Sequence, residues 1–156
     1  MGKWGGRASI LVVGEEEALL STLQRFVERR GMADVFVAHG FEQARSILAG
    51  LHFDGVAIDV DLPFGEAPKL LVELSVTYPS TRRVGIGRAS RRGLEALVEA
   101  GLADAVVAKP IDVGEFLEAM FPGRDLSMPA PQRALNAAMV GAPQFIIEQD
   151  STPLPI

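Results

Sequence analysis

The sequence predicts an α/β fold of the doubly wound class, in which helices cover both faces of a five-stranded parallel sheet. Two observations predict it. Five short apolar runs rich in β-branched residues recur along the chain, as expected of strands that are covered on both faces. The intervals between them carry helical patterns and are long enough for right-handed crossover connections. The expected architecture is (βα)5, five strands that are each followed by a helix.

The five predicted strands end where polar or charged residues begin. They span residues 9–13, 35–38, 56–59, 84–87 and 105–108. The third run is the most informative, because it brings an acid, Asp59, to its last position, where a buried core would not place a charge. In an open α/β sheet the carboxyl ends of the strands form the edge at which ligands bind. We therefore expect a functional site at that edge.

Each predicted helix shows an apolar stripe and a residue that favours a helix end. The stripes lie within residues 19–27, 41–48, 70–74, 94–98 and 113–121. Gly31, Gly50 and Gly101 end the first, second and fourth helices, since glycine accommodates the left-handed backbone of a helix end. Pro68 marks the start of the third helix, which ends before Pro79.

Side chains that can cap a helix N-terminus precede the last two helices. Ser90 is placed to cap the fourth helix. Asp112 is placed to cap the fifth, and Glu115, three residues later, completes a capping-box pattern. With these elements in this order, the predicted sheet is flavodoxin-like, with strand order 2-1-3-4-5.

The 156 residues suffice for one domain with a core and an appendage. Residues 1–7 read as a glycine-rich leader, and residues 8–121 hold the five strand–helix units. The character changes in residues 122–156, where prolines stand at positions 129, 131, 143, 153 and 155. This segment is expected to be a linker or tail rather than a second domain.

Composition argues against several classes of protein. No apolar stretch approaches the roughly 20 residues that span a bilayer, so no membrane association is expected. The chain has no cysteine, which rules out a disulfide or a thiolate site within it. A formal net charge of −5 disfavours direct nucleic-acid binding, which usually needs a basic stripe. A soluble cytoplasmic protein is expected.

Charged residues follow three of the predicted strands and would meet at one edge of the sheet. Asp59 ends the third strand, Lys109 follows the fifth, and carboxylates at positions 15–17 follow the first. Carboxylate oxygens are the ligands that a hard divalent cation prefers, and a lysine beside them would balance part of their charge.

In these residues the chain resembles the receiver domain of response regulators, such as the chemotaxis regulators. The resemblance covers about residues 8–121. It rests on Asp59 with the following Val-Asp-Leu-Pro, which matches the pattern Asp-x-x-hydrophobic-Pro, and on Lys109 with Pro110. The resemblance implies that Asp59 is the phosphoacceptor and that Lys109 neutralises the product. It also implies Mg²⁺ as the cofactor, held by Glu15, Asp59 and Asp61.

The acidic pair that usually follows the first strand of this family is altered. Gly14 takes its first position and Glu15 its second, and glutamate is one methylene longer than aspartate. We therefore expect a weakened metal site, for which Glu16 or Asp61 would have to compensate. Glu15 is the favoured ligand, whereas Glu16 and Glu17 are expected only to favour the helix macrodipole.

The residues that relay phosphorylation in the family are also altered. The usual Ser or Thr after the fourth strand falls on Gly87 or Arg88, neither of which has a hydroxyl. The usual aromatic residue of the fifth strand is replaced by Ala105 or Val106. If Arg88 points inward, it is expected to form a charge-assisted pair with Asp59. If it points outward, it is one more charge on a basic loop.

The predicted function is that of a receiver domain in two-component signal transduction, and not that of an enzyme. It would accept a phosphoryl group on Asp59 from a histidine kinase or phosphotransfer protein. The fourth helix, fifth strand and fifth helix would present the surface for a downstream partner, and a homodimer is a further expectation. The alternative is a pseudo-receiver that binds partners without phosphorylation. A flavodoxin-like enzyme or cofactor binder is disfavoured, because residues 85–90 lack the spacing of a phosphate-binding loop.

Overall fold

The computed structural model describes residues 7–124. Residues 1–6 and 125–156 lie outside the described part of the chain, and with them nearly all of the predicted leader and tail. The division into leader, domain and tail therefore stays a prediction.

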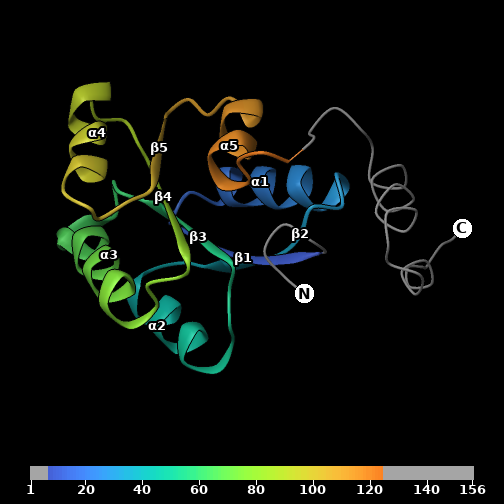
Figure 1. Cartoon of the computed structure of the whole chain (residues 1–156), viewed down its shortest axis with the longest axis horizontal. Helices are drawn as coiled ribbons and strands as arrows, with labels where there is room; N and C mark the ends of the chain where they lie inside the picture. The colour runs from blue at the N-terminus through green and yellow to red at the C-terminus, as the bar shows by residue number, and fades with distance from the viewer. Residues whose placement is uncertain (1–6, 125–156) are drawn as a thin grey trace, which may run out of the picture.

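Five strands alternate with five helices, and a short 3-10 turn precedes the third helix. The elements are β1 (Ala8–Val13), α1 (Glu17–Arg29), β2 (Ala33–Ala38), α2 (Phe41–Gly50), β3 (Gly55–Asp59), η1 (Pro63–Gly65), α3 (Glu66–Thr77), β4 (Arg82–Gly87), α4 (Arg91–Glu99), β5 (Ala105–Ala108) and α5 (Val113–Met120). The strands form one parallel sheet in the order β2-β1-β3-β4-β5 (Figure 1). The predicted fold class and strand order are confirmed.

Several predicted element ends are confirmed at the level of single contacts. The Ser90 hydroxyl accepts a hydrogen bond from the Gly93 amide at the start of α4, and the Asp112 carboxylate accepts one from the Glu115 amide at the start of α5. Gly31, just beyond α1, has the left-handed backbone that glycine tolerates, with φ of 67°.

Other boundaries differ from the prediction. Strands β2 and β4 each begin two residues earlier than predicted, because the backbones of Ala33 and Arg82 join the ladder although the apolar pattern starts later. Helix α3 begins at Glu66 rather than near Pro68, since a proline in the first turn interrupts no intrahelical hydrogen bond. Gly50 is the last residue of α2 and does not take a left-handed conformation there.

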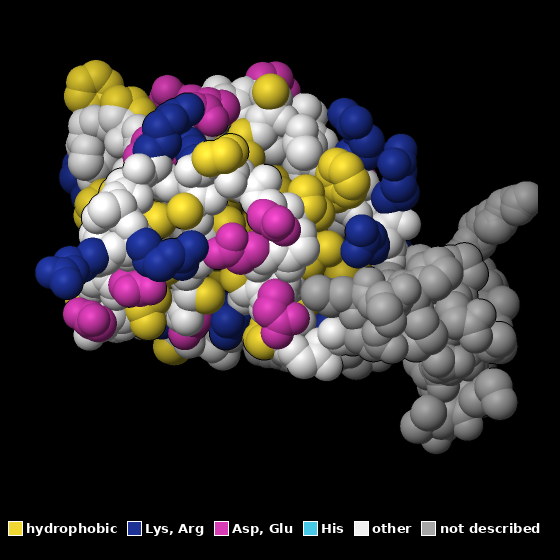
Figure 2. Space-filling model, turned by 90° about the horizontal axis from the view of Figure 1, so that it is seen from above, with side chains coloured by type: hydrophobic (Ala, Val, Ile, Leu, Met, Phe, Trp, Pro, Cys, Tyr) yellow, Lys and Arg dark blue, Asp and Glu magenta, His cyan; other side chains and the backbone are white. Residues whose placement is uncertain are grey.

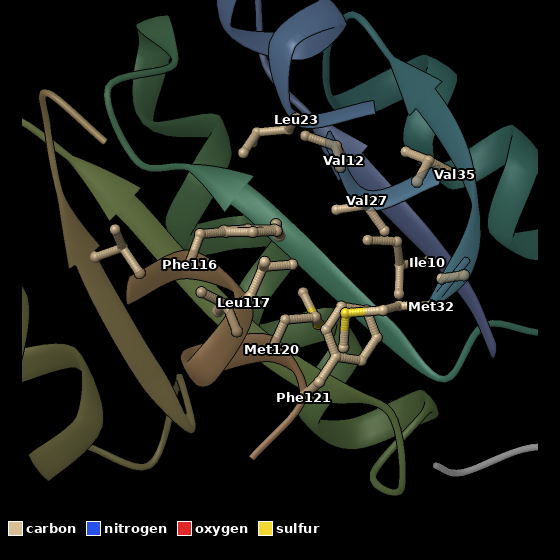
Figure 3. Packing of buried hydrophobic residues seen from close by; sticks show 14 of the residues in the cluster. Ile10, Val12, Leu23, Val27, Met32, Val35, Phe116, Leu117, Met120 and Phe121 are labelled. Carbon is tan, nitrogen blue, oxygen red and sulfur yellow. The ribbon is translucent and has the colours of Figure 1, made fainter. Parts of the chain in front are cut away.

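The sheet separates two apolar layers. Helices α1 and α5 lie on one face of the sheet and helices α2 and α3 on the other (Figure 1). Figure 3 shows the first layer, in which Leu23 and Val27 of α1 meet Phe116 and Met120 of α5 above the strands. The second layer is formed by β3 with α2 and α3, and Leu97 of α4 packs against it. Within residues 7–124, no helix combines the length and the apolar character needed to cross a bilayer.

Backbone hydrogen bonds align the carboxyl ends of the central and outer strands. The Val60 amide, just after β3, donates to the Ile86 carbonyl at 2.7 Å. The Lys109 amide, just after β5, donates to the Gly87 carbonyl at 2.8 Å. The residues that follow β3, β4 and β5 are therefore held at one edge of the sheet, which the prediction identified as the functional edge.

Candidate functional site

Lys109 is the centre of the charged site. Its Nζ lies 2.9 Å from Asp59 Oδ2, 3.1 Å from Asp61 Oδ2 and 3.4 Å from Glu16 Oε1. The Lys109 side chain is only 7% exposed. A buried ammonium is costly unless charged or polar partners surround it, and here three carboxylates do so. We call Glu16, Asp59 and Asp61 the acid cluster.

Asp59 occupies the last position of β3, where it pairs with Ile86 of β4. Its side chain is 6% exposed. One carboxylate oxygen accepts the hydrogen bond from Lys109, and the other accepts a hydrogen bond of 2.9 Å from the Asp61 amide. Strand and turn together therefore fix the orientation of this buried carboxylate.

Arg88 lies over the outer side of the acid cluster. One guanidinium nitrogen is 2.8 Å from Glu16 Oε2 and the other is 3.6 Å from Asp61 Oδ2, and the Arg88 amide donates to the same Asp61 oxygen at 3.1 Å. The Arg88 side chain is 64% exposed. Of the two orientations considered for Arg88, neither is found as described: Lys109 rather than Arg88 pairs with Asp59, and Arg88, although exposed, binds the two outer acids.

These ion pairs shift the pKa values of the groups that form them. The hydrogen bond from Arg88 lowers the pKa of Glu16, with a further contribution from Lys109. Burial alone would lower the pKa of Lys109, but its hydrogen bonds to Asp59 and Asp61 outweigh that effect and raise the pKa above the ordinary value. The pKa of Arg88 is raised mainly by its hydrogen bond to Glu16.

Glu16, and not Glu15, faces the site. Glu15 is exposed, whereas Glu16 is half-buried and contacts both Lys109 and Arg88. The expectation that Glu16 serves only the helix macrodipole is therefore wrong. The sequence carries no signal for this choice, because β1 ends at Val13 and residues 14–16 lie in the following loop, where side chains need not alternate as in a strand.

Gly14 packs directly against Asp59. A Cβ atom at position 14 would lie 3.2 Å from Asp59 Cβ and 3.6 Å from its Oδ2. An aspartate at this position would crowd Asp59 and bring a like charge close to it. The change at the first acidic position thus leaves room for a close contact between the β1–α1 loop and the end of β3.

Gly87, at the predicted switch position, has no room for a side chain. A Cβ atom there would overlap Cγ2 of Val60 and would lie 3.2 Å from Cδ2 of Leu94. Valine is stiff about its first side-chain torsion, so Val60 cannot move aside at low cost. Val60, the residue after Asp59, therefore fills the space that a Ser or Thr side chain at position 87 would need.

A shallow cavity of about 500 Å³ adjoins the acid cluster. It is lined by Glu16, Leu19, Arg88, Lys109, Pro110 and Ile111. Asp59 is not among the lining residues, so the charged groups that a molecule in the cavity would contact are Glu16, Arg88 and Lys109.

Comparison with known proteins identifies the family. The sequence model of the response regulator receiver domain matches residues 10–121, which is more than half of the chain. The chain belongs to the response regulator receiver domain family. No curated protein matches the chain.

Solved receiver domains share this fold. The signal receiver domain of an HD domain-containing protein from Pseudomonas fluorescens Pf-5 is 28% identical, with a TM-score of 0.66 over 76% of this chain and 88% of that chain. The chemotaxis response regulator CheY4 of Vibrio cholerae is 17% identical, with a TM-score of 0.65 over 72% of this chain and 94% of that chain. A Burkholderia pseudomallei response regulator, solved with a phosphorylated aspartic acid, calcium ion and citrate, is 23% identical, with a TM-score of 0.66 over 85% of this chain and 74% of that chain.

Receiver domains are generally signalling modules without enzymatic activity, and they typically bind Mg²⁺. They interact with kinases or phosphotransfer proteins and with downstream partners. In this receiver domain the donor chemistry suits Mg²⁺, since the acid cluster offers carboxylate oxygens. Its arrangement does not, because the carboxylates turn toward Lys109 and Arg88. In residues 7–124, no three His, Cys, Asp or Glu side chains are gathered so that they could hold a metal ion.

The pKa of Lys109 can be measured directly, because the chain contains only three lysines, at positions 3, 69 and 109. We expect NMR of ¹³C-labelled lysine to show Lys109 losing its proton above the ordinary range near pH 10.4. Its stabilising contribution should be complete below that range and should be lost as the pH rises through the elevated pKa. In Asp59→Asn the transition should move to lower pH. A Lys109 transition at or below pH ~10.4 in the unmodified protein would contradict this geometry.

The space at position 87 predicts a coupled pair of substitutions. Gly87→Thr should lower the free energy of unfolding by about 1–3 kcal/mol, because it overfills the contact with Val60. Val60→Ala removes the opposing methyl groups. The loss of unfolding free energy in the double variant should therefore be smaller than the sum of the two single losses, by at least about 0.5 kcal/mol. Chemical denaturation of the four proteins measures this coupling. Simple additivity would show that Val60 does not fill the switch position.

Proposed function

We propose that this receiver domain accepts a phosphoryl group on Asp59 from a histidine kinase or a phosphotransfer protein. The observation that carries the proposal is the contact of 2.9 Å between Lys109 Nζ and Asp59 Oδ2 at the carboxyl edge of the sheet. This contact supports the proposal because it fixes the orientation of the carboxylate and places a cation beside it. Positioning and charge neutralisation are the main demands of phosphoryl transfer.

In the proposed step, a carboxylate oxygen of Asp59 forms a bond to phosphorus. The bond between phosphorus and the donor histidine nitrogen breaks, and that nitrogen keeps the electron pair and takes a proton from water. The Asp59 carboxylate loses its charge in this step, and Lys109 then pairs with the oxygens of the new phosphoryl group. The cavity beside Arg88 and Lys109 supports an approach from that side.

The metal ligands are part of the proposal. Mg²⁺, when bound, supplies positive charge beside the phosphoryl oxygens. Glu15, Asp59 and Asp61 were the predicted ligands, and the position of Glu16 favours it over the exposed Glu15. We propose that the site binds Mg²⁺ weakly, because the acids that would hold it already pair with Lys109 and Arg88.

The proposed partner surface is formed by α4, β5 and α5. Both helices pack against β5, and Val98 of α4 is an exposed apolar side chain. A downstream protein or a second copy of the chain would bind there. Direct nucleic-acid binding is not part of the proposal. On the face of the molecule that Figure 2 shows, basic side chains of the described residues are interspersed with acidic ones and do not form a basic stripe. We place the domain in the cytoplasm, where histidine kinases have access to ATP, and assign it no enzymatic activity of its own.

A pseudo-receiver is the second candidate function, and one observation favours it. Gly87 has no hydroxyl that could draw the following loop toward a phosphoryl group, and Val60 fills the space that a Ser or Thr side chain there would need. In that case the same fold would bind its partner in a single state.

Mass spectrometry after incubation with Mg²⁺ and a small acyl-phosphate donor tests the proposal. We expect the full chain to gain one phosphoryl group that depends on Mg²⁺. The gain should be absent in Asp59→Asn, which keeps the shape of the side chain and removes the nucleophile. Asp54→Asn, which changes an acid at the opposite end of β3, is the matched control and should still be modified. No added mass at millimolar donor would support the pseudo-receiver instead.

A further inference from the structure

Two cationic side chains contact the acid cluster, although one of them, Lys109, already pairs with the buried Asp59. Lys109 alone reaches all three carboxylates. Arg88 adds a second cation from the solvent side and contacts only the outer acids, Glu16 and Asp61. The buried Asp59 therefore has its own partner, and Arg88 neutralises the oxygens that remain open to solvent.

The formal charge of the site indicates that Arg88 takes the place of a divalent cation. Three carboxylates with Lys109 and Arg88 have a formal charge of −1. Without Arg88 the formal charge would be −2, which one divalent cation neutralises. The oxygens that Arg88 contacts, from Glu16 and Asp61, are of the type that Mg²⁺ prefers. A divalent cation and the guanidinium therefore compete for the same ligands.

We propose that Arg88 is a built-in competitor of the divalent cation and determines how tightly this receiver domain binds Mg²⁺. Metal binding requires that the guanidinium leave Glu16 and Asp61. Its 64% exposed side chain can do so without disturbing the core. This inference rests on the proposed function, because the metal is the one that phosphoryl transfer to Asp59 would use.

The competition is specific to Arg88 among the basic residues around the start of α4. Arg91 pairs with Glu115 of α5, at 3.6 Å. Arg92 is exposed, and none of the ion pairs found within residues 7–124 involves it. Arg92 thus offers a matched control, since its removal changes the net charge by the same amount close to the site and leaves the acid cluster untouched.

Calorimetric titration of the full chain with Mg²⁺ tests the inference. Arg88→Ala should bind Mg²⁺ at least about tenfold more tightly than the unmodified protein, because a cation in direct contact with the ligands is removed. Arg92→Ala should differ by no more than about twofold, since exposed charges at a distance are screened by salt. Arg88→Gln, of similar size and without charge, should behave like Arg88→Ala. It also serves if the alanine variant fails to fold.

The outcomes distinguish this inference from the proposed function. Equal gains in Arg88→Ala and Arg92→Ala, or no gain in either Arg88 variant, would overturn the inference. If unmodified protein is phosphorylated on Asp59 while Arg88→Ala binds Mg²⁺ no more tightly, only the inference fails. If Arg88→Ala gains the predicted affinity and neither protein is phosphorylated by the acyl-phosphate donor, the inference stands and the proposed function fails.

Discussion

The buried ion pair between Lys109 and Asp59 is the constraint on which the rest of the site depends. Both side chains are almost fully removed from solvent, so the charge of Asp59 requires Lys109, and the charge of Lys109 requires the carboxylates around it. The sheet brings the two residues together, because the carboxyl ends of the parallel strands β3 and β5 lie at one edge. Backbone hydrogen bonds keep these ends aligned. Glu16 and Asp61 also contact the ammonium group of Lys109.

The departures from the family pattern form one consistent arrangement around this pair. Gly14 allows the first loop to approach Asp59 closely, and Gly87 leaves its space to Val60. Arg88 follows and covers the acids that remain exposed. The two glycines thus allow close contacts next to the buried pair, and Arg88 balances part of the charge of the outer acids.

The fold and the principal pair could be predicted from the sequence, because they depend on repeated patterns. Apolar runs with helical intervals specify a parallel sheet, and a charge at the end of a buried run marks its functional edge. The choice between Glu15 and Glu16 and the partners of Arg88 could not be predicted in the same way. They depend on the direction of single side chains in loops, where one residue of difference moves a carboxylate from solvent to the site. The role of Val60 could not be predicted either, because it arises from a contact between the loop after β3 and the last residue of β4.

A double-mutant cycle between residues 59 and 109 tests the central claim most directly. Lys109→Met strands a buried carboxylate, whereas Asp59→Asn leaves Lys109 its contacts with Asp61 and Glu16. If the two side chains form the pair described above, the two losses of unfolding free energy should overlap in the double variant, with a coupling of at least about 1 kcal/mol. Losses that add to within about 0.5 kcal/mol would show that the two charges do not interact and would contradict the account.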